Sequence, residues 1–221
     1  MDFLSNSLSY AGTFLQIVLL VLIIRGPLSR YFPLFLYVLS SVAVSVSLAF
    51  VLQKWGSDLE HYFPVFWGGE LLLDLQLFLL MITLTPRALE GNPLRSSVVR
   101  IMGVALVVVL VMPFVAFDSK VFTTKWNDST SQLLNFGAAV MNLALWGALL
   151  VSKQRDRQLL TVSGGLGVAV AGAALAYGIR SFTDEDSVGR LLADYLYRLL
   201  QIGAVLIWCW AFRPARKPAP V

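Results

Sequence analysis

The chain has 221 residues, of which 57% are hydrophobic and only 14% are charged. With a mean hydropathy of +0.74, this composition excludes an ordinary soluble domain and indicates an integral membrane protein. The net charge of +4 does not predict a nucleic-acid partner, because the basic residues lie in short segments between apolar runs. The single cysteine, Cys209, and the single histidine, His61, exclude an intrachain disulfide and a Cys/His metal cluster. We therefore expect no metal and no cofactor.

Seven apolar segments are each long enough to cross about 30 Å of hydrocarbon as a helix. They lie near residues 5–25, 31–52, 62–84, 98–117, 130–151, 159–180 and 190–212. The sequence therefore predicts an all-α seven-helix transmembrane bundle over residues 1–212, followed by a basic, proline-rich tail over 213–221. The first segment has no small-residue cleavage site before Arg25, so we expect a first span and not a signal peptide.

The distribution of Lys and Arg predicts how the bundle is oriented. Eleven of the 17 flank the spans on the side of the C-terminus and five flank them on the other side. Since cytoplasmic loops carry the excess of basic residues, we expect an outside N-terminus and a cytoplasmic C-terminus in the plasma (inner) membrane. Aromatic residues near the segment ends, such as Tyr31, Tyr177 and Trp208, are interpreted as interfacial belts. The expected partners are the lipid bilayer and a further membrane protein or a second copy of the chain.

The third segment carries two acidic residues, Glu70 and Asp74, within its apolar run. They lie four residues apart and so share one helix face, with Trp67 one turn before. A charged side chain near the bilayer centre costs about 2.5 to 3.5 kcal/mol on insertion scales. These carboxyls are therefore expected to be paired, protonated or in contact with water.

The last segment offers a basic partner, because Asp194, Arg198 and Gln201 share one helix face. Counting about 1.5 Å per residue from the outer ends places Arg198 and Glu70 at the same depth, about 12 Å in. This match predicts that the third and seventh spans touch and that Arg198 pairs with Glu70 or Asp74. The competing pairing is local, between Arg198 and Asp194.

Three acids around one arginine cannot all be ionised cheaply in a medium of low dielectric constant. We therefore expect at least one carboxyl, the deeper Asp74, to be protonated near neutral pH. Asn135 and Asn142 of the fifth segment lie seven apart and so on one face, as further polar candidates. The other amides and serines at membrane depth are expected to hydrogen-bond between helices.

The sixth segment spaces small residues by four, at Gly165, Ala169 and Ala173. Such a stripe lets neighbouring backbones approach closely, which predicts a tightly packed position in the bundle.

Motifs of several seven-span and intramembrane families are absent. All five lysines lie outside the spans, so no retinal Schiff base can form, and the receptor motif Asn-Pro-x-x-Tyr and the Pro-Gln pair of PQ-loop transporters are missing. Rhomboid proteases need Gly-x-Ser-Gly and a membrane histidine, and intramembrane aspartyl proteases need Gly-x-Gly-Asp; neither pattern occurs. No family resemblance and no catalytic residue is assigned.

Three functional hypotheses follow. The leading one is a non-enzymatic module, either a small-ligand sensor or a subunit of a membrane assembly. The alternative is a proton- or cation-coupled transporter, for which the glycine pair Gly68 and Gly69 offers the one candidate break in a helix. The third is an intramembrane lipid hydrolase with Glu70 and Asp74 as acid and base, although no nucleophile supports it.

Overall fold

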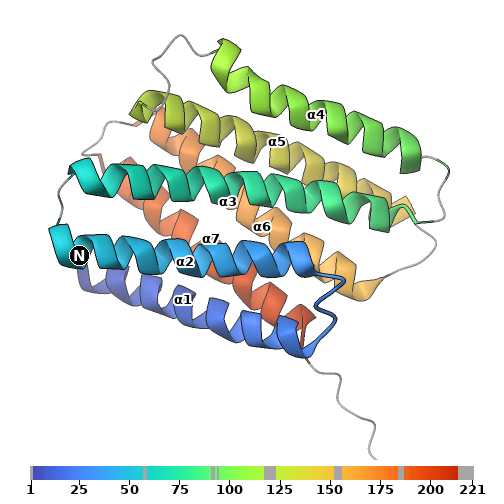
Figure 1. The fold of residues 1–221 in the computed structure, drawn as a ribbon, viewed down its shortest axis with the longest axis horizontal. Helices are drawn as coiled ribbons and strands as arrows, with labels where there is room; N and C mark the ends of the chain where they lie inside the picture. The colour runs from blue at the N-terminus through green and yellow to red at the C-terminus, as the bar shows by residue number, and fades with distance from the viewer. Residues whose placement is uncertain are drawn as a thin grey trace, which may run out of the picture.

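The computed structural model describes residues 2–56, 59–90, 93, 95–116, 123–151, 156–183 and 187–213. Within these ranges every regular element is an α-helix (Figure 1). In chain order they are α1 (Asp2–Arg25), α2 (Phe32–Trp55), α3 (Leu59–Ala88), α4 (Arg95–Ala116), α5 (Thr124–Val151), α6 (Arg157–Ser181) and α7 (Val188–Ala211). The expected basic tail lies outside the described residues from 214 onward.

By length and composition, six of these helices can cross a membrane: α1, α2, α3, α4, α6 and α7. Within its described residues, the predicted seventh span, α5, is not among them; the first half of this helix carries several polar side chains that are buried in the bundle. These are Asn127, Thr130, Ser131 and Asn135. The exposed surface of the six apolar helices, in contrast, is rich in large apolar side chains. Examples are Phe14 and Val107, which are 66% and 60% exposed. Such a surface is typical of a bundle surrounded by lipid.

Six helices form a closed ring in which neighbours pack in the order α1, α2, α3, α5, α6, α7 and back to α1. The remaining helix, α4, lies outside this ring against α3 and α5 (Figure 1). The prediction that the third and seventh spans touch is wrong: within the described residues α3 packs on α2, α4, α5 and α6, and α7 packs on α1 and α6. The two helices therefore face each other across the ring without direct packing.

The two ends of the bundle are called here the Glu70 end, toward which Glu70 lies on α3, and the Arg30 end, at which Arg30 lies. At the Glu70 end, α1, α3 and α7 begin and α2 and α6 finish; at the Arg30 end, α1, α3 and α7 finish and α2 and α6 begin. An ion pair at the Arg30 end joins Arg30, in the connection before α2, to Asp156. Asp156 also accepts hydrogen bonds from the backbone N–H groups of Gln158 and Leu159, so it caps the start of α6.

The small residues of α6 pack closely, as predicted. Ala169 and Ala173 are buried, and a Cβ added at Gly165 would lie only 2.3 Å from Nε1 of Trp208 on α7. The indole of Trp208 occupies this space and donates a hydrogen bond of 3.0 Å to the carbonyl of Val162. Glycine at 165 therefore leaves room for the Trp208 indole of α7 against the backbone of α6.

Polar side chains also connect neighbouring helices. Gln16 of α1 donates to Ser41 of α2, and Gln76 of α3 donates to Ser40 of α2, each at 2.9 Å. The prediction that amides and serines at membrane depth hydrogen-bond between helices is confirmed for these pairs.

Candidate functional site

The helix α3 places Glu70 and Asp74 on successive turns of one face. The helix continues through Gly68 and Gly69 without a break, so the glycine pair does not divide it. Instead, a Cβ added at Gly69 would lie 2.5 Å from Cγ1 of Val44, which means that glycine allows α2 to pack closely beside the first carboxyl.

Asp74 is nine-tenths buried and is held from α5. Its Oδ1 accepts a hydrogen bond of 2.8 Å from Nδ2 of Asn135, and the same amide donates at 2.9 Å to the carbonyl of Ser131. In the described part of the chain, Oδ2 of Asp74 and the Ser131 hydroxyl are buried without a hydrogen-bond partner. One half of this carboxyl is therefore available to a proton or another cation.

Glu70 is held from α6. Its Oε2 accepts a hydrogen bond of 3.0 Å from the hydroxyl of Tyr177, and the side chain is only partly buried. The nearest cation acting on Glu70 is Arg180, whose guanidinium lies 5.2 Å from the centre of the Tyr177 ring. Arg180 is itself bound to Asp194 of α7, with Nε 2.9 Å from Oδ1. The order of contacts is therefore Asp194, Arg180, Tyr177, Glu70.

The predicted partners of Arg198 are wrong. Arg198 donates a hydrogen bond of 3.3 Å to Ser9 of α1, while Glu70, Asp74 and Asp194 take the other partners described above. Two residues at equal depth do not meet when their helices lie on opposite sides of a ring. Arg180, which was counted among the basic residues flanking the spans, lies in the last turn of α6 and reaches Asp194.

The other predicted candidates are not bonded to the two carboxyls. The indole nitrogen of Trp67 is buried without a partner among the described residues, and its ring packs edge-on to Phe66. Asn142 lies two turns beyond Asn135 on α5. It packs against Gly167 of α6, and a Cβ added at Gly167 would lie 2.7 Å from Nδ2 of Asn142. Gln201 is partly buried on α7 and forms no hydrogen bond in the described part of the structure.

Three tyrosines near the carboxyls were not predicted as site residues. Tyr177 was interpreted as an interfacial aromatic, yet it is buried and bonded to Glu70. Tyr37 of α2 and Tyr197 of α7 lie within electrostatic range of both carboxyls. The sequence feature that could have indicated them is a tyrosine inside an apolar span, because a buried hydroxyl needs a polar partner.

The arrangement offers acceptor groups for a proton or another cation. Two carboxyls one turn apart offer oxygen atoms, and neither is ion-paired with a basic side chain in the part of the chain described. The described residues include no group of three or more acidic, histidine or cysteine side chains that could hold a metal ion. The nearest hydroxyls belong to tyrosines and to Ser131, and the groups beside them are the two carboxyls themselves.

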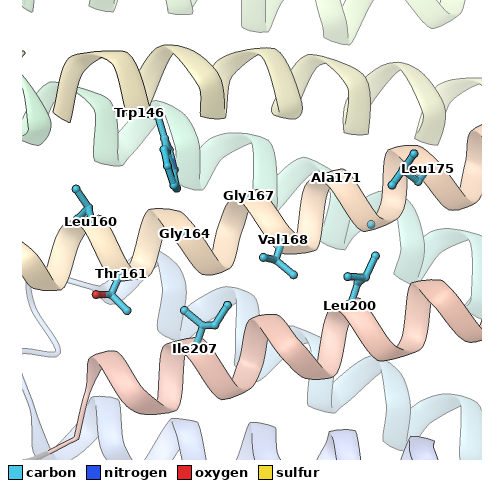
Figure 2. Close-up of a pocket in the computed structure, with 11 residues that line it drawn as sticks. Trp146, Leu160, Thr161, Gly164, Gly167, Val168, Ala171, Leu175, Leu200 and Ile207 are labelled. Atoms are coloured by element: carbon cyan, nitrogen blue, oxygen red, sulfur yellow. The ribbon is translucent and has the colours of Figure 1, made fainter. Parts of the chain in front are cut away.

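A separate apolar groove runs along α6, away from the carboxyls (Figure 2). Its volume is about 560 Å³, and it lies between Trp146 of α5 and the side chains of Leu200 and Ile207 on α7. Small residues of α6, such as Gly164 and Gly167, form its floor. The lining contains no ionisable side chain, so the groove adds no acid–base chemistry.

The chain was also compared with known proteins. No protein-family model, no curated protein sequence and no solved structure matches it. The functional argument therefore depends on the geometry of the chain itself.

Proposed function

We propose that the protein is a multi-pass plasma-membrane protein with its Glu70 end outside and its Arg30 end in the cytoplasm. The excess of Lys and Arg around the Arg30 end supports this orientation. We further propose that α5 crosses the membrane together with the six more apolar helices. It packs between α3 and α6 in the ring, and its polar side chains are turned inward, where they are shielded from lipid.

Within this bundle, we propose a non-enzymatic sensor that binds a small cation at Glu70 and Asp74. The observation that carries the proposal is the free half of the Asp74 carboxyl, buried one turn from Glu70, with no basic side chain bonded to either in the described residues. Ionisable groups at membrane depth are rare and costly, and they commonly mark a binding site. Nearby tyrosines favour a cation as the ligand, because aromatic faces and hydroxyl oxygens both attract positive charge.

The packing beyond Asp74 supports sensing over conduction. Toward the Arg30 end, the next turns of α3 bury a continuous apolar layer formed by Leu77, Phe78, Leu80, Met81 and Leu84. Between Asp74 and Thr85, this face of α3 offers a bound cation no buried polar side chain to carry it onward. A site closed on one side favours reversible binding from the Glu70 end.

Thermal unfolding of the purified protein in lipid nanodiscs tests the proposal, with methylammonium chloride as the probe and sodium chloride at equal ionic strength as the reference. Binding to the native state raises the unfolding midpoint in a saturable way. We expect saturable stabilisation by methylammonium in the wild type and its loss in Glu70→Gln and Asp74→Asn. Glu90→Gln, an exposed acid at the other end, is the matched control and should keep the effect. An equal response in Asp74→Asn and the wild type would refute the site.

One observation favours a second candidate, a cation-coupled transporter. In each of the units α1–α2–α3 and α5–α6–α7, the middle helix packs on the other two. The two units meet through α3 with α5 and through α7 with α1, and α4 lies outside both. Transporters often place their site between two such repeats. Uptake of labelled methylammonium into proteoliposomes, driven by a proton gradient and lost in Asp74→Asn, would favour transport. Binding without uptake would favour sensing.

A further inference from the structure

An ion pair between α6 and α7 lies at the Glu70 end of the bundle. Nε of Arg180 lies 2.9 Å from Oδ1 of Asp194, and Nη2 of the same guanidinium bonds to the same oxygen. The Arg180 side chain is 26% exposed and the Asp194 side chain is 41% exposed, so the pair is accessible from outside the bundle. An ion pair this exposed contributes little to folding stability. Its main consequence is therefore the place at which it holds the guanidinium.

This guanidinium lies within reach of Glu70. Tyr177 precedes Arg180 by three residues, so the two side chains are neighbours on one face of α6. The guanidinium lies over the Tyr177 ring, 5.2 Å from its centre, and the hydroxyl of that ring lies 3.0 Å from Oε2 of Glu70. A guanidinium can stack along the face of an aromatic ring. We therefore expect a change of rotamer, without movement of either helix, to bring Arg180 from Asp194 to Glu70.

Two acids thus compete for one cationic side chain. Asp194 holds Arg180, while the bond described for Glu70 comes from the neutral hydroxyl of Tyr177. A guanidinium bound to Glu70 would supply the positive charge and the hydrogen bonds that an incoming cation could otherwise supply. Arg180 and a bound cation would therefore exclude each other at this carboxyl.

We propose that Asp194 is a positioning residue of the cation site, which holds Arg180 away from Glu70 and so leaves that carboxyl free for a ligand. The effect on ligand affinity rests on the proposed cation site, whereas the competition of two acids for Arg180 does not. Apparent affinity scales with the fraction of molecules whose site is free. If Arg180 occupies Glu70 in about nine molecules of ten, cation binding weakens about tenfold.

Equilibrium binding of methylammonium to the protein in nanodiscs tests this effect. Asp194→Asn keeps the shape of the side chain and removes its charge, and we expect affinity to fall about tenfold. Adding Arg180→Gln to this variant should restore the affinity, because the competing guanidinium is gone. A purely structural ion pair predicts no such recovery. Glu90→Gln removes an equal charge from an exposed residue at the other end and should bind like the wild type.

Wild-type affinity in Asp194→Asn would overturn the proposal. So would a variant with both substitutions that binds as weakly as Asp194→Asn alone.

A measurement without ligand separates this inference from the cation site itself. The coupling between Glu70→Gln and Arg180→Gln is obtained from equilibrium unfolding in a double-mutant cycle, once with Asp194 and once in the Asp194→Asn background. We expect stronger coupling in the Asp194→Asn background, where Arg180 pairs with Glu70. Equal coupling in the two backgrounds would overturn the inference. Stronger coupling in a protein whose wild type binds no methylammonium would refute the cation site and retain the role of Asp194.

Discussion

The hydroxyl of Tyr177 donates a hydrogen bond of 3.0 Å to Oε2 of Glu70 and so joins α6 to α3 across the interior of the ring. The Arg180 guanidinium lies over the ring of the same tyrosine, 5.2 Å from its centre, and is bound to Asp194 of α7. One tyrosine therefore connects three helices to the candidate cation site.

Tyr177→Phe should lower the free energy of unfolding by about 1.5 to 3 kcal/mol, because it removes a hydrogen bond to a carboxyl in a low-dielectric interior. Equilibrium unfolding in mixed detergent measures the change. Tyr10→Phe is the control, since Tyr10 is 76% exposed and the variant should unfold like the wild type. Equal stability of Tyr177→Phe and wild type would show that this hydrogen bond contributes nothing.

Asn135 and Asp74 should be energetically coupled, because the Asn135 amide donates a hydrogen bond to the buried carboxyl. Asn135→Ala alone should cost about 1 to 3 kcal/mol of unfolding free energy. In an Asp74→Ala background the same change should cost less, with a coupling energy of about 0.5 to 3 kcal/mol from the double-mutant cycle. Strictly additive effects would mean that the two side chains act independently.

Gly165→Ala should destabilise the bundle by about 1 to 3 kcal/mol, since the new methyl would meet the Trp208 indole at 2.3 Å. The matched control is Gly147→Ala on α5, where an added Cβ meets nothing within 4 Å. This control should be neutral or slightly stabilising. Thermal unfolding midpoints compare the two, and a neutral Gly165→Ala would contradict the close packing of α6 and α7.

Without a bound cation, Asp74 should carry a proton near neutral pH, because it is buried beside a second carboxyl, and a cation that binds there would displace this proton. Infrared difference spectra of wild type against Asp74→Asn should contain the carbonyl band of a protonated carboxyl. Glu90→Gln should leave that band in place. If the wild type lacks the band, Asp74 is ionised and needs a permanently bound cation.

The helices themselves could be predicted from the sequence, because long apolar runs separated by charged connections determine where a chain can cross a bilayer. The described helices agree with all seven predicted segments to within a few residues, although α3 and α5 begin earlier than the apolar runs do. Glu70 and Asp74 could also be chosen from the sequence as candidate site residues, because acidic residues within an apolar run are rare.

The hydrogen-bond and ion-pair partners of these carboxyls could not be predicted, because the depth of a residue along a helix says nothing about the order of helices around the ring. Arg198 matches Glu70 in depth but contacts Ser9 of α1. Arg180 was counted as a basic residue flanking its span and Tyr177 was interpreted as part of an interfacial belt, because a residue near the end of a span looks the same in the sequence whether it faces water or the interior. Helix packing alone distinguishes these cases.

Direct equilibrium binding of radiolabelled methylammonium to the nanodisc-embedded protein tests the central claim, that Glu70 and Asp74 form a cation site. The account predicts one saturable site per chain in the wild type and in Glu90→Gln, and none in Asp74→Asn. A wild type without saturable binding, or an Asp74→Asn variant that retains it, would contradict the account.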